Sequence, residues 1–202
     1  MRIYRGGMAR KNVRRVKDLE TVKALGHPLR MRLYRALMVT QRATASQLAE
    51  QVDEAVSLVS YHLRKLAAHG LIEEAEQGSA DGRERWWQAA VSGVSTEDVD
   101  FRDAPESEGA YVALSRLAAR QRHELYQSYL DTKSAWPDEW RDASFNSEYL
   151  LSLTPQELVG LRTEMNELLK KWEARSDAAR EAGEREGREH VAVHTAGFPF
   201  RP

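Results

Sequence analysis

Cysteine is absent from the 202 residues of this chain. Disulfides, thiolate nucleophiles and cysteine-ligated metal sites are therefore excluded. No apolar run approaches the roughly 20 residues that a membrane-spanning helix needs, and the basic N-terminus lacks the apolar stretch of a signal peptide. A Gly-rich phosphate loop, Gly-x-Ser-x-Gly and His-Glu-x-x-His are also missing. We expect a cytoplasmic protein that is neither an enzyme nor a membrane protein.

The net charge of −1 conceals an asymmetry between the two halves of the chain. Residues 1–90 carry 16 basic and 10 acidic side chains, whereas residues 91–202 carry 14 and 21. Seven basic side chains and no acid lie within the first 17 residues: Arg2, Arg5, Arg10, Lys11, Arg14, Arg15 and Lys17. Such a cluster is typical of a segment that contacts a polyanion. A solvated basic tail is the other interpretation.

The first half of the chain predicts four helices followed by a β-hairpin. Residues 1–17 contain Gly6-Gly7 and little apolar content, so we expect a flexible basic arm there. The helices should begin near Val16, Pro28, Thr44 and Ala55, and the strands should cover residues 71–76 and 83–90. Thr44 or Ser46 can cap the third helix, and Gln47 stands where a capping box requires it. Residues 18–91 should form one domain.

The second half predicts a mostly helical region. Residues 92–108 are rich in Ser, Asp, Glu and Pro, which is typical of a linker. One long helix is expected over 106–133. Another is expected after Thr154, which can cap it; a proline follows at the first helical position, and a glutamate stands three residues after the threonine, as in a capping box. The alternation in residues 190–195 allows one short C-terminal strand. The C-terminal region therefore spans 109–202.

The fourth helix has two unlike faces when successive residues are placed about 100° apart. One face is apolar, with Val56, Val59, Leu63 and Leu66. The opposite face carries Ser57, Tyr61, Arg64, Lys65 and Ala68, with Ser60 at the rim and His62 nearer the core than Tyr61. Arginine can bind guanine with two hydrogen bonds, while hydroxyls and lysine hold phosphates. This face therefore suits the major groove of DNA.

Residues 24–90 resemble the ArsR-type winged helix-turn-helix repressors of bacteria. The segments that carry the resemblance are Ala24–Leu33, Thr44–Ala49, Ser60–Leu66, His69–Leu71 and Gly82–Trp87. The last segment and the helical extension resemble a subgroup common in actinobacteria. The resemblance implies a homodimeric transcriptional regulator that binds double-stranded DNA and is associated with the nucleoid.

The same resemblance implies which residues meet DNA. On the fourth helix they are Ser57, Ser60, Tyr61, His62, Arg64 and Lys65. Thr44, Ser46 and Gln47 would lie near phosphate, and Arg83 and Arg85 would reach DNA from the wing. The sequence departs from the family at Ala55, where relatives usually have a hydroxyl that caps the recognition helix; Asp53 or Glu54 are the candidates to replace it.

Founding members of this family sense metals, and this sequence departs from them. Without cysteine, thiolate sites are impossible. His123 and Glu124 are adjacent, so they cannot point at one metal from one helix face. His190 and His194 can share a strand face, but two imidazoles without a third ligand make a poor site. We expect no metal and no other cofactor.

The last predicted helix carries a seam of apolar residues spaced three and four apart. The seam consists of Leu158, Leu161, Met165, Leu168 and Trp172. It has two interpretations, as a contact with the helix at 106–133 or as a dimer interface, and both can hold together.

Aromatic residues gather around the expected junction of the two regions. They are Trp86, Trp87, Trp136, Trp140, Phe145 and Tyr149. They either belong to the core or line a pocket for a small-molecule effector that the sequence does not identify.

Together these patterns predict a mainly α-helical fold with a small β-hairpin wing: a winged helix-turn-helix domain followed by a helical dimerisation or regulatory region. The function they favour is a sequence-specific DNA-binding repressor that acts as a homodimer on a pseudo-palindromic operator. The alternative is a protein-interaction module whose winged helix binds another protein. The salt dependence of binding to duplex DNA distinguishes the two, because phosphate neutralisation releases counterions.

Overall fold

A computed structural model describes residues 13–75 and 84–201. The chain divides into two compact units, 1–126 and 127–202. The division falls inside a long helix, α5 (Pro105–Thr132), and not at the linker that we expected over residues 92–108. Most of the basic arm (1–12) and Arg83 of the wing lie outside the described residues.

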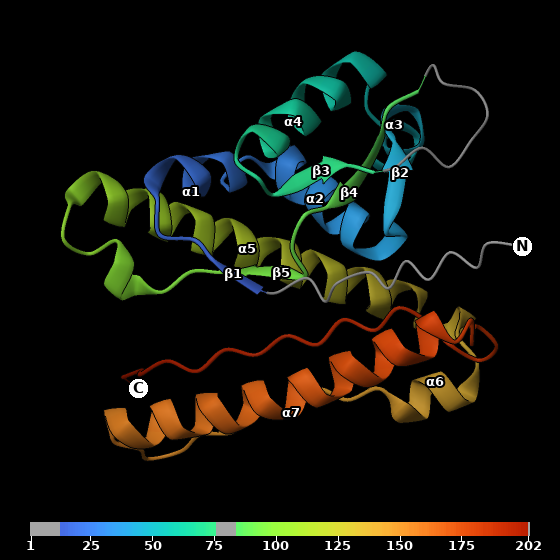
Figure 1. Cartoon of the computed structure of the whole chain (residues 1–202). Helices are drawn as coiled ribbons and strands as arrows, with labels where there is room; N and C mark the ends of the chain where they lie inside the picture. The colour runs from blue at the N-terminus through green and yellow to red at the C-terminus, as the bar shows by residue number, and fades with distance from the viewer. Residues whose placement is uncertain (1–12, 76–83, 202) are drawn as a thin grey trace, which may run out of the picture. The chain divides into compact units, whose positions relative to one another are not determined.

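Four helices open the first unit in the expected order: α1 (Leu19–Leu25), α2 (Pro28–Thr40), α3 (Ala45–Val52) and α4 (Val56–Ala68) (Figure 1). Side-chain caps begin three of these helices, α1, α2 and α3. The Asp18 carboxylate accepts a hydrogen bond from the Thr21 amide at 2.8 Å, so α1 begins at Leu19 and not at Val16 as predicted. Val16 instead enters the core as a fully buried residue.

A three-stranded antiparallel sheet packs beside these helices, in the order β2-β4-β3. The predicted hairpin is confirmed as β3 (Ile72–Glu74) and β4 (Trp86–Ala89), which pair from Ile72 opposite Ala89. The sequence did not predict β2 (Arg42–Thr44), which pairs with β4 and places Ala43 opposite Trp87. This pairing joins the wing to the start of α3.

The core of the first unit lies between the helices and this sheet. Its fully buried members include Leu33 and Leu37 of α2, Leu48 of α3, and Val59, Leu63 and Leu66 of α4. The apolar faces that helical periodicity predicted are the faces that pack together here, except at Val56, which is 47% exposed. The fold is therefore a winged helix-turn-helix, as the sequence predicted.

The end of the basic arm is folded, contrary to our expectation for residues 13–17. Strand β1 (Val13–Arg15) pairs in parallel with β5 (Gly93–Ser95). The Arg15 guanidinium donates two hydrogen bonds to the Asp100 carboxylate, at 2.7 and 2.9 Å. Charge alone suggested a solvated segment, but strand pairing and these ion pairs fix it to the domain.

The segment expected as a linker, 92–108, is likewise built into the first unit. It contains β5 and a 3₁₀ helix (Asp98–Asp100). Phe101 is only 2% exposed and stacks on Tyr111 of α5, with ring centroids 5.5 Å apart. The linker prediction is wrong because one buried aromatic ring anchors a segment whose composition is otherwise polar.

Helix α5 confirms the long helix predicted over 106–133. In the first unit it buries Leu114, Leu117 and Gln121. The Gln121 amide donates to the Pro28 carbonyl at the start of α2, at 3.2 Å. The first unit therefore consists of the winged helix-turn-helix domain with the first part of α5 packed on it.

The second unit contains a short helix, α6 (Asp138–Ala143), and a long one, α7 (Pro155–Glu181). The predicted capping box is confirmed, because Thr154 and Glu157 exchange side-chain and backbone hydrogen bonds. The C-terminal segment runs beside α7 (Figure 1), where Gly197 approaches the Leu158 side chain.

The strand predicted over 190–195 does not form. No strand of the described residues offers it hydrogen-bond partners, and Val191 is 67% exposed. Within the same described ranges, no helix is long and apolar enough to span a membrane.

Candidate nucleic-acid interface

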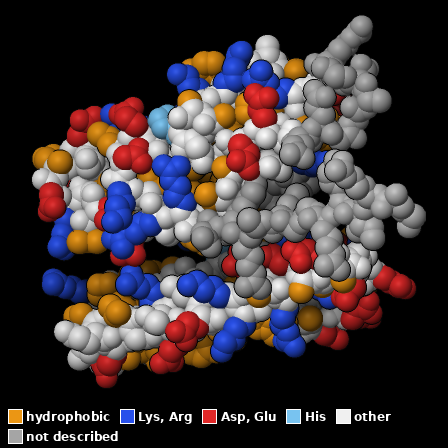
Figure 2. Space-filling view, viewed as in Figure 1, with side chains coloured by type: hydrophobic (Ala, Val, Ile, Leu, Met, Phe, Trp, Pro, Cys, Tyr) orange, Lys and Arg blue, Asp and Glu red, His pale blue; other side chains and the backbone are white. Residues whose placement is uncertain are grey.

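Helix α4 presents a polar and cationic face to solvent. Its exposed residues include Ser57, Tyr61, Arg64 and Lys65, and Ser60 is half-buried at the rim. The Lys65 ammonium lies 5.8 Å from the centre of the Tyr61 ring, within the range of a cation–π contact. The helix carries no Asp or Glu. Figure 2 shows Lys and Arg side chains gathered over α4. Such a face can approach a polyanion without repulsion from the helix itself.

His62 does not belong to this face, although the resemblance placed it on DNA. Only 4% of His62 is exposed, and its ring lies 4.4 Å from that of His27, the residue that caps α2. The sequence left the burial of His62 undecided, because the residue lies between the apolar face and the polar face of the helix. The ring packs against His27, which lies between the end of α1 and the start of α2. His62 therefore joins α4 to the rest of the domain.

The pKa of both histidines is lowered, first of all because burial disfavours the charged ring. Arg30 adds to the shift of each, and Glu54 opposes it at His62. The His27 Nδ1 atom accepts a hydrogen bond from the Leu29 amide at 3.2 Å. Protonation at that atom would remove the cap of α2.

We therefore expect the free energy of unfolding to fall as the pH drops below the ordinary histidine value of 6.5. In that range the unfolded chain binds protons that the folded chain resists. Urea unfolding at about pH 7.5, 6.5 and 5.5 measures the effect, above the range in which the carboxylates titrate. His27→Asn keeps a capping oxygen and removes a titrating group, so its pH dependence should be flatter. Identical slopes for the variant and the parent would contradict the assignment.

Helix α3 begins with the predicted capping box. The Gln47 amide donates to the Thr44 hydroxyl at 3.3 Å, and the Gln47 side chain accepts from the Thr44 amide at 3.0 Å. Thr44 is buried, so it caps α3. It does not face a DNA phosphate, contrary to our expectation. The Ser46 hydroxyl lies 2.9 Å from the Glu84 carboxylate. Of the three, Gln47 has the most exposed side chain.

The turn between α3 and α4 leaves the start of α4 without a side-chain cap. Ala55 occupies the cap position, and neither Asp53 nor Glu54 replaces the missing hydroxyl. Asp53 ends α3 with a left-handed backbone, at φ 53°. Val56, predicted on the apolar face, is 47% exposed because the first turn projects beyond the core.

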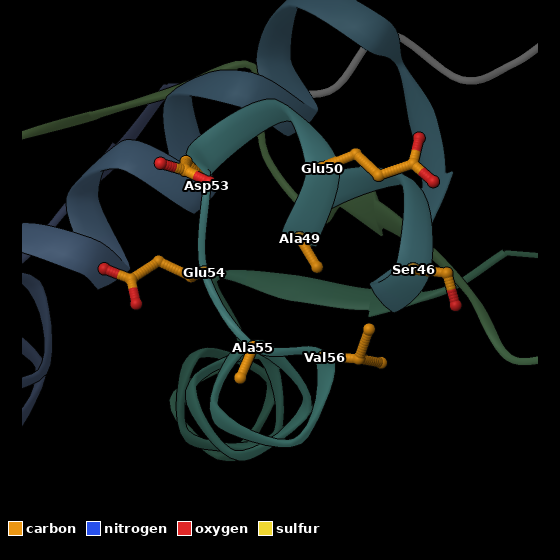
Figure 3. Close-up of a pocket in the computed structure, with 7 residues that line it drawn as sticks. All are labelled: Ser46, Ala49, Glu50, Asp53, Glu54, Ala55 and Val56. Atoms are coloured by element: carbon orange, nitrogen blue, oxygen red, sulfur yellow. The ribbon is translucent and has the colours of Figure 1, made fainter.

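A shallow cavity of about 470 Å³, wide open to solvent, lies between α3 and this turn (Figure 3). Ala49, Ala55 and Val56 supply its apolar part, and Ser46, Glu50, Asp53 and Glu54 its polar part. Among the described residues no group of three or more His, Asp or Glu side chains is arranged to hold a metal ion.

The base of the wing carries two arginines against its tryptophans. Arg85 lies over the Trp87 ring and 3.2 Å from the Glu74 carboxylate. Arg42 of β2 lies over the Trp86 ring, at 5.7 Å, with its side chain exposed. Sequence analysis missed Arg42 because β2 itself was not predicted. Arg83 lies outside the described residues.

Arg14 has a structural role that its place in the basic arm did not suggest. Its guanidinium donates to the carbonyl of His69, at 2.7 Å, where α4 ends. A cation at a helix C-terminus is favourable because the last carbonyl groups have no partner within the helix. Strand β1 therefore secures the C-terminal end of α4.

Residues 25–75 match the family model described as "Helix-turn-helix domain". No curated protein matches the chain. Among solved structures, the chain is similar to a transcriptional regulator homologue from Pyrococcus horikoshii OT3, with 18% identity over 49% of this chain and 88% of that one and a TM-score of 0.31.

Two further solved structures are similar at the same level. YusO from Bacillus subtilis shares 18% identity over 58% of this chain and 80% of its own, with a TM-score of 0.33. A zinc-responsive MarR family member from Lactococcus lactis, ZitR, shares 15% over 66% and 74%, with a TM-score of 0.29.

The apolar seam on α7 lies largely in solvent. Met165 is 37% exposed, Leu168 55% and Trp172 58%, whereas Leu158 and Leu161 are half-buried. Arg175 covers one face of the Trp172 ring, at 4.8 Å. The second unit therefore does not itself enclose the C-terminal half of the seam.

The six aromatic residues considered for an effector pocket do not share one environment. Trp87 is 4% exposed in the core of the first unit, whereas Phe145 and Tyr149 are 80% and 78% exposed in the second. Trp136 and Trp140 pack edge to face, with centroids 6.5 Å apart. The cavity at the start of α4 contains none of these rings.

Proposed function

We propose that this protein is a transcriptional regulator that binds double-stranded DNA sequence-specifically, as a homodimer on a pseudo-palindromic operator. The observation that carries the proposal is the face of α4, where Ser57, Tyr61, Arg64 and Lys65 are exposed on a helix without a single acidic residue. The helix-turn-helix match over residues 25–75 supports it. The resemblance to ArsR-type repressors supports repression as the outcome of binding.

The proposed DNA contacts divide into base-reading and backbone groups. Arg64 is the base-reading candidate because its guanidinium can form two hydrogen bonds with one guanine. Ser57, Ser60, Tyr61 and Lys65 would hold phosphates around it, with Gln47 at the N-terminal end of α3. Arg85 and Arg42 would approach the flanking backbone from the wing. A small-molecule effector stays a hypothesis that depends on the aromatic residues of the second unit.

The size of the proposed reading surface supports a homodimer. One recognition helix covers only a few base pairs, and a two-fold dimer doubles the site and makes it palindromic. The exposed residues of the α7 seam, Met165, Leu168 and Trp172, supply apolar surface for such a contact.

Selection from random duplex oligonucleotides with the purified full chain tests this function. We expect a palindromic consensus, and affinity for it that falls steeply with salt as counterions are released. A reporter gene placed behind the selected site should be silenced when the protein is present. If no duplex is enriched and binding is insensitive to salt, the winged helix serves protein interaction and the proposal fails.

The basic arm gives a separate prediction about affinity. Because Arg14 and Arg15 hold the fold together, the arm must be tested by deleting residues 1–12, which removes Arg2, Arg5, Arg10 and Lys11. We expect weaker binding to all duplexes alike, and a salt slope reduced by about 0.9 for each phosphate that the shortened chain no longer neutralises. Sequence preference should survive because the reading face lies on α4. Full affinity together with an unchanged slope would show that the arm does not touch DNA.

A further inference from the structure

The first turn of α4 places two aliphatic side chains in solvent. Val56 is 47% exposed and Leu58 is 40% exposed, whereas Val59, Leu63 and Leu66 of the same helix are fully buried. The turn is well formed, since the Val59 amide donates to the Ala55 carbonyl at 3.0 Å. Exposed aliphatic surface of this kind gains free energy when an apolar partner covers it.

The charges beside this turn restrict what the partner can be. Leu58, Tyr61 and Lys65 follow one another at helical spacing, and Lys65 lies over the Tyr61 ring. Leu58 is therefore continuous with the cationic face of α4, which contains no acid, whereas Val56 lies on the side of the turn nearer α3. A matching partner must present apolar groups close to negative charge. Thymine in duplex DNA does this, because its C5-methyl group projects into the major groove between two phosphate backbones.

The surroundings of Val56 favour a base edge over a phosphate. Val56 faces the cavity beside α3 together with Ala49 and Ala55 (Figure 3). The same cavity carries Glu50, Asp53 and Glu54, whose carboxylates repel phosphate groups. A DNA backbone is therefore disfavoured here, and the N-terminal end of a recognition helix is the part that usually contacts base edges.

We infer that Val56 and Leu58 read thymine methyl groups in the operator, and so determine thymine at one or more positions of each half-site. This inference rests on the proposed function, since it assigns a base preference to the same helix. It adds an apolar element of specificity to the hydrogen bonds expected from Arg64.

The test replaces single thymines of the selected operator with deoxyuridine, which lacks only the C5-methyl group. The wild-type full chain should lose affinity at the positions that Val56 and Leu58 contact, roughly fourfold for each methyl group removed. Deoxyuridine at other positions should have no effect. Because the protein is unchanged in this experiment, a folding defect cannot produce the result.

Two variants then assign the effect. Each variant, Leu58→Ala or Val56→Ala, should bind two operators equally well: one with thymine and one with deoxyuridine at the position that the missing side chain contacts. Val39→Ala is the matched control, since Val39 is 37% exposed and belongs to α2, not to α4; it should discriminate as the wild type does. If wild type tolerates deoxyuridine at every position but prefers its operator to a random duplex, the inference is overturned and the proposed function stands. If it prefers no duplex, both are overturned.

Discussion

Replacing Arg64 with alanine is expected to weaken binding to the selected operator by about 1–3 kcal/mol, or roughly 5- to 150-fold. The reason is that the guanidinium lies exposed on the outer face of α4, where it can reach a guanine. Binding to a scrambled duplex should change less, because that binding rests on phosphate contacts. Lys65→Ala should instead weaken binding to both duplexes alike, and it should reduce the slope of log K against log salt by about 1. Fluorescence anisotropy titrations at several salt concentrations measure both quantities.

Arg116→Ala provides the matched control for the removed charge. Arg116 is an exposed residue of α5 outside the recognition helix, so its removal should leave the preference for the operator intact. The more demanding variant combines Arg64→Ala with Tyr61→Ala, since Tyr61 is 47% exposed on the same face. Unchanged affinity of this double variant for the operator would show that α4 is not the reading helix.

Leu168→Asp combined with Trp172→Asp is expected to convert the proposed homodimer into a monomer at micromolar concentration. Both side chains are more than half exposed in the single chain, so carboxylates there should be tolerated in the folded monomer and repelled in an apolar interface. Operator affinity should fall by about 10²- to 10⁴-fold, because two linked binding sites exceed a single site in affinity by a factor in this range. Sedimentation equilibrium gives the mass, and the same anisotropy titration gives the affinity.

Val159→Asp is the control on the same helix. Val159 is 52% exposed but lies away from the seam, about 100° from Leu158. It should leave the dimer intact. A wild-type chain that is monomeric at these concentrations would rule out the interface, and a double variant that stays dimeric would place the interface elsewhere.

Local sequence patterns determined much of the fold, wherever a few neighbouring residues are sufficient. The Thr154–Glu157 capping box begins α7 as predicted, because its hydrogen bonds join residues three apart. The Thr44–Gln47 box does the same for α3. The polar face of α4 was also predictable, since helical periodicity places Ser57, Tyr61 and Arg64 together whatever surrounds them.

Only the tertiary structure decided which surfaces meet, because those contacts join residues far apart in the sequence. Strand β1 pairs with β5 about 80 residues later, and this pairing converts part of a basic arm into a folded strand. The same contact brings Arg14 to the end of α4. Composition alone cannot reveal this, since a cation that binds phosphate and one that binds a carbonyl look alike in the sequence.

The division between buried and exposed residues of α4 was decided in the same way. His62 lies at the edge of the apolar stripe, and its burial depends on His27 closing over it from the start of α2. Val56 has the helical phase of a core residue, yet it is exposed because the first turn extends past the elements that cover Val59. Periodicity gives the direction of a side chain from the helix axis, whereas packing determines whether another element lies in that direction.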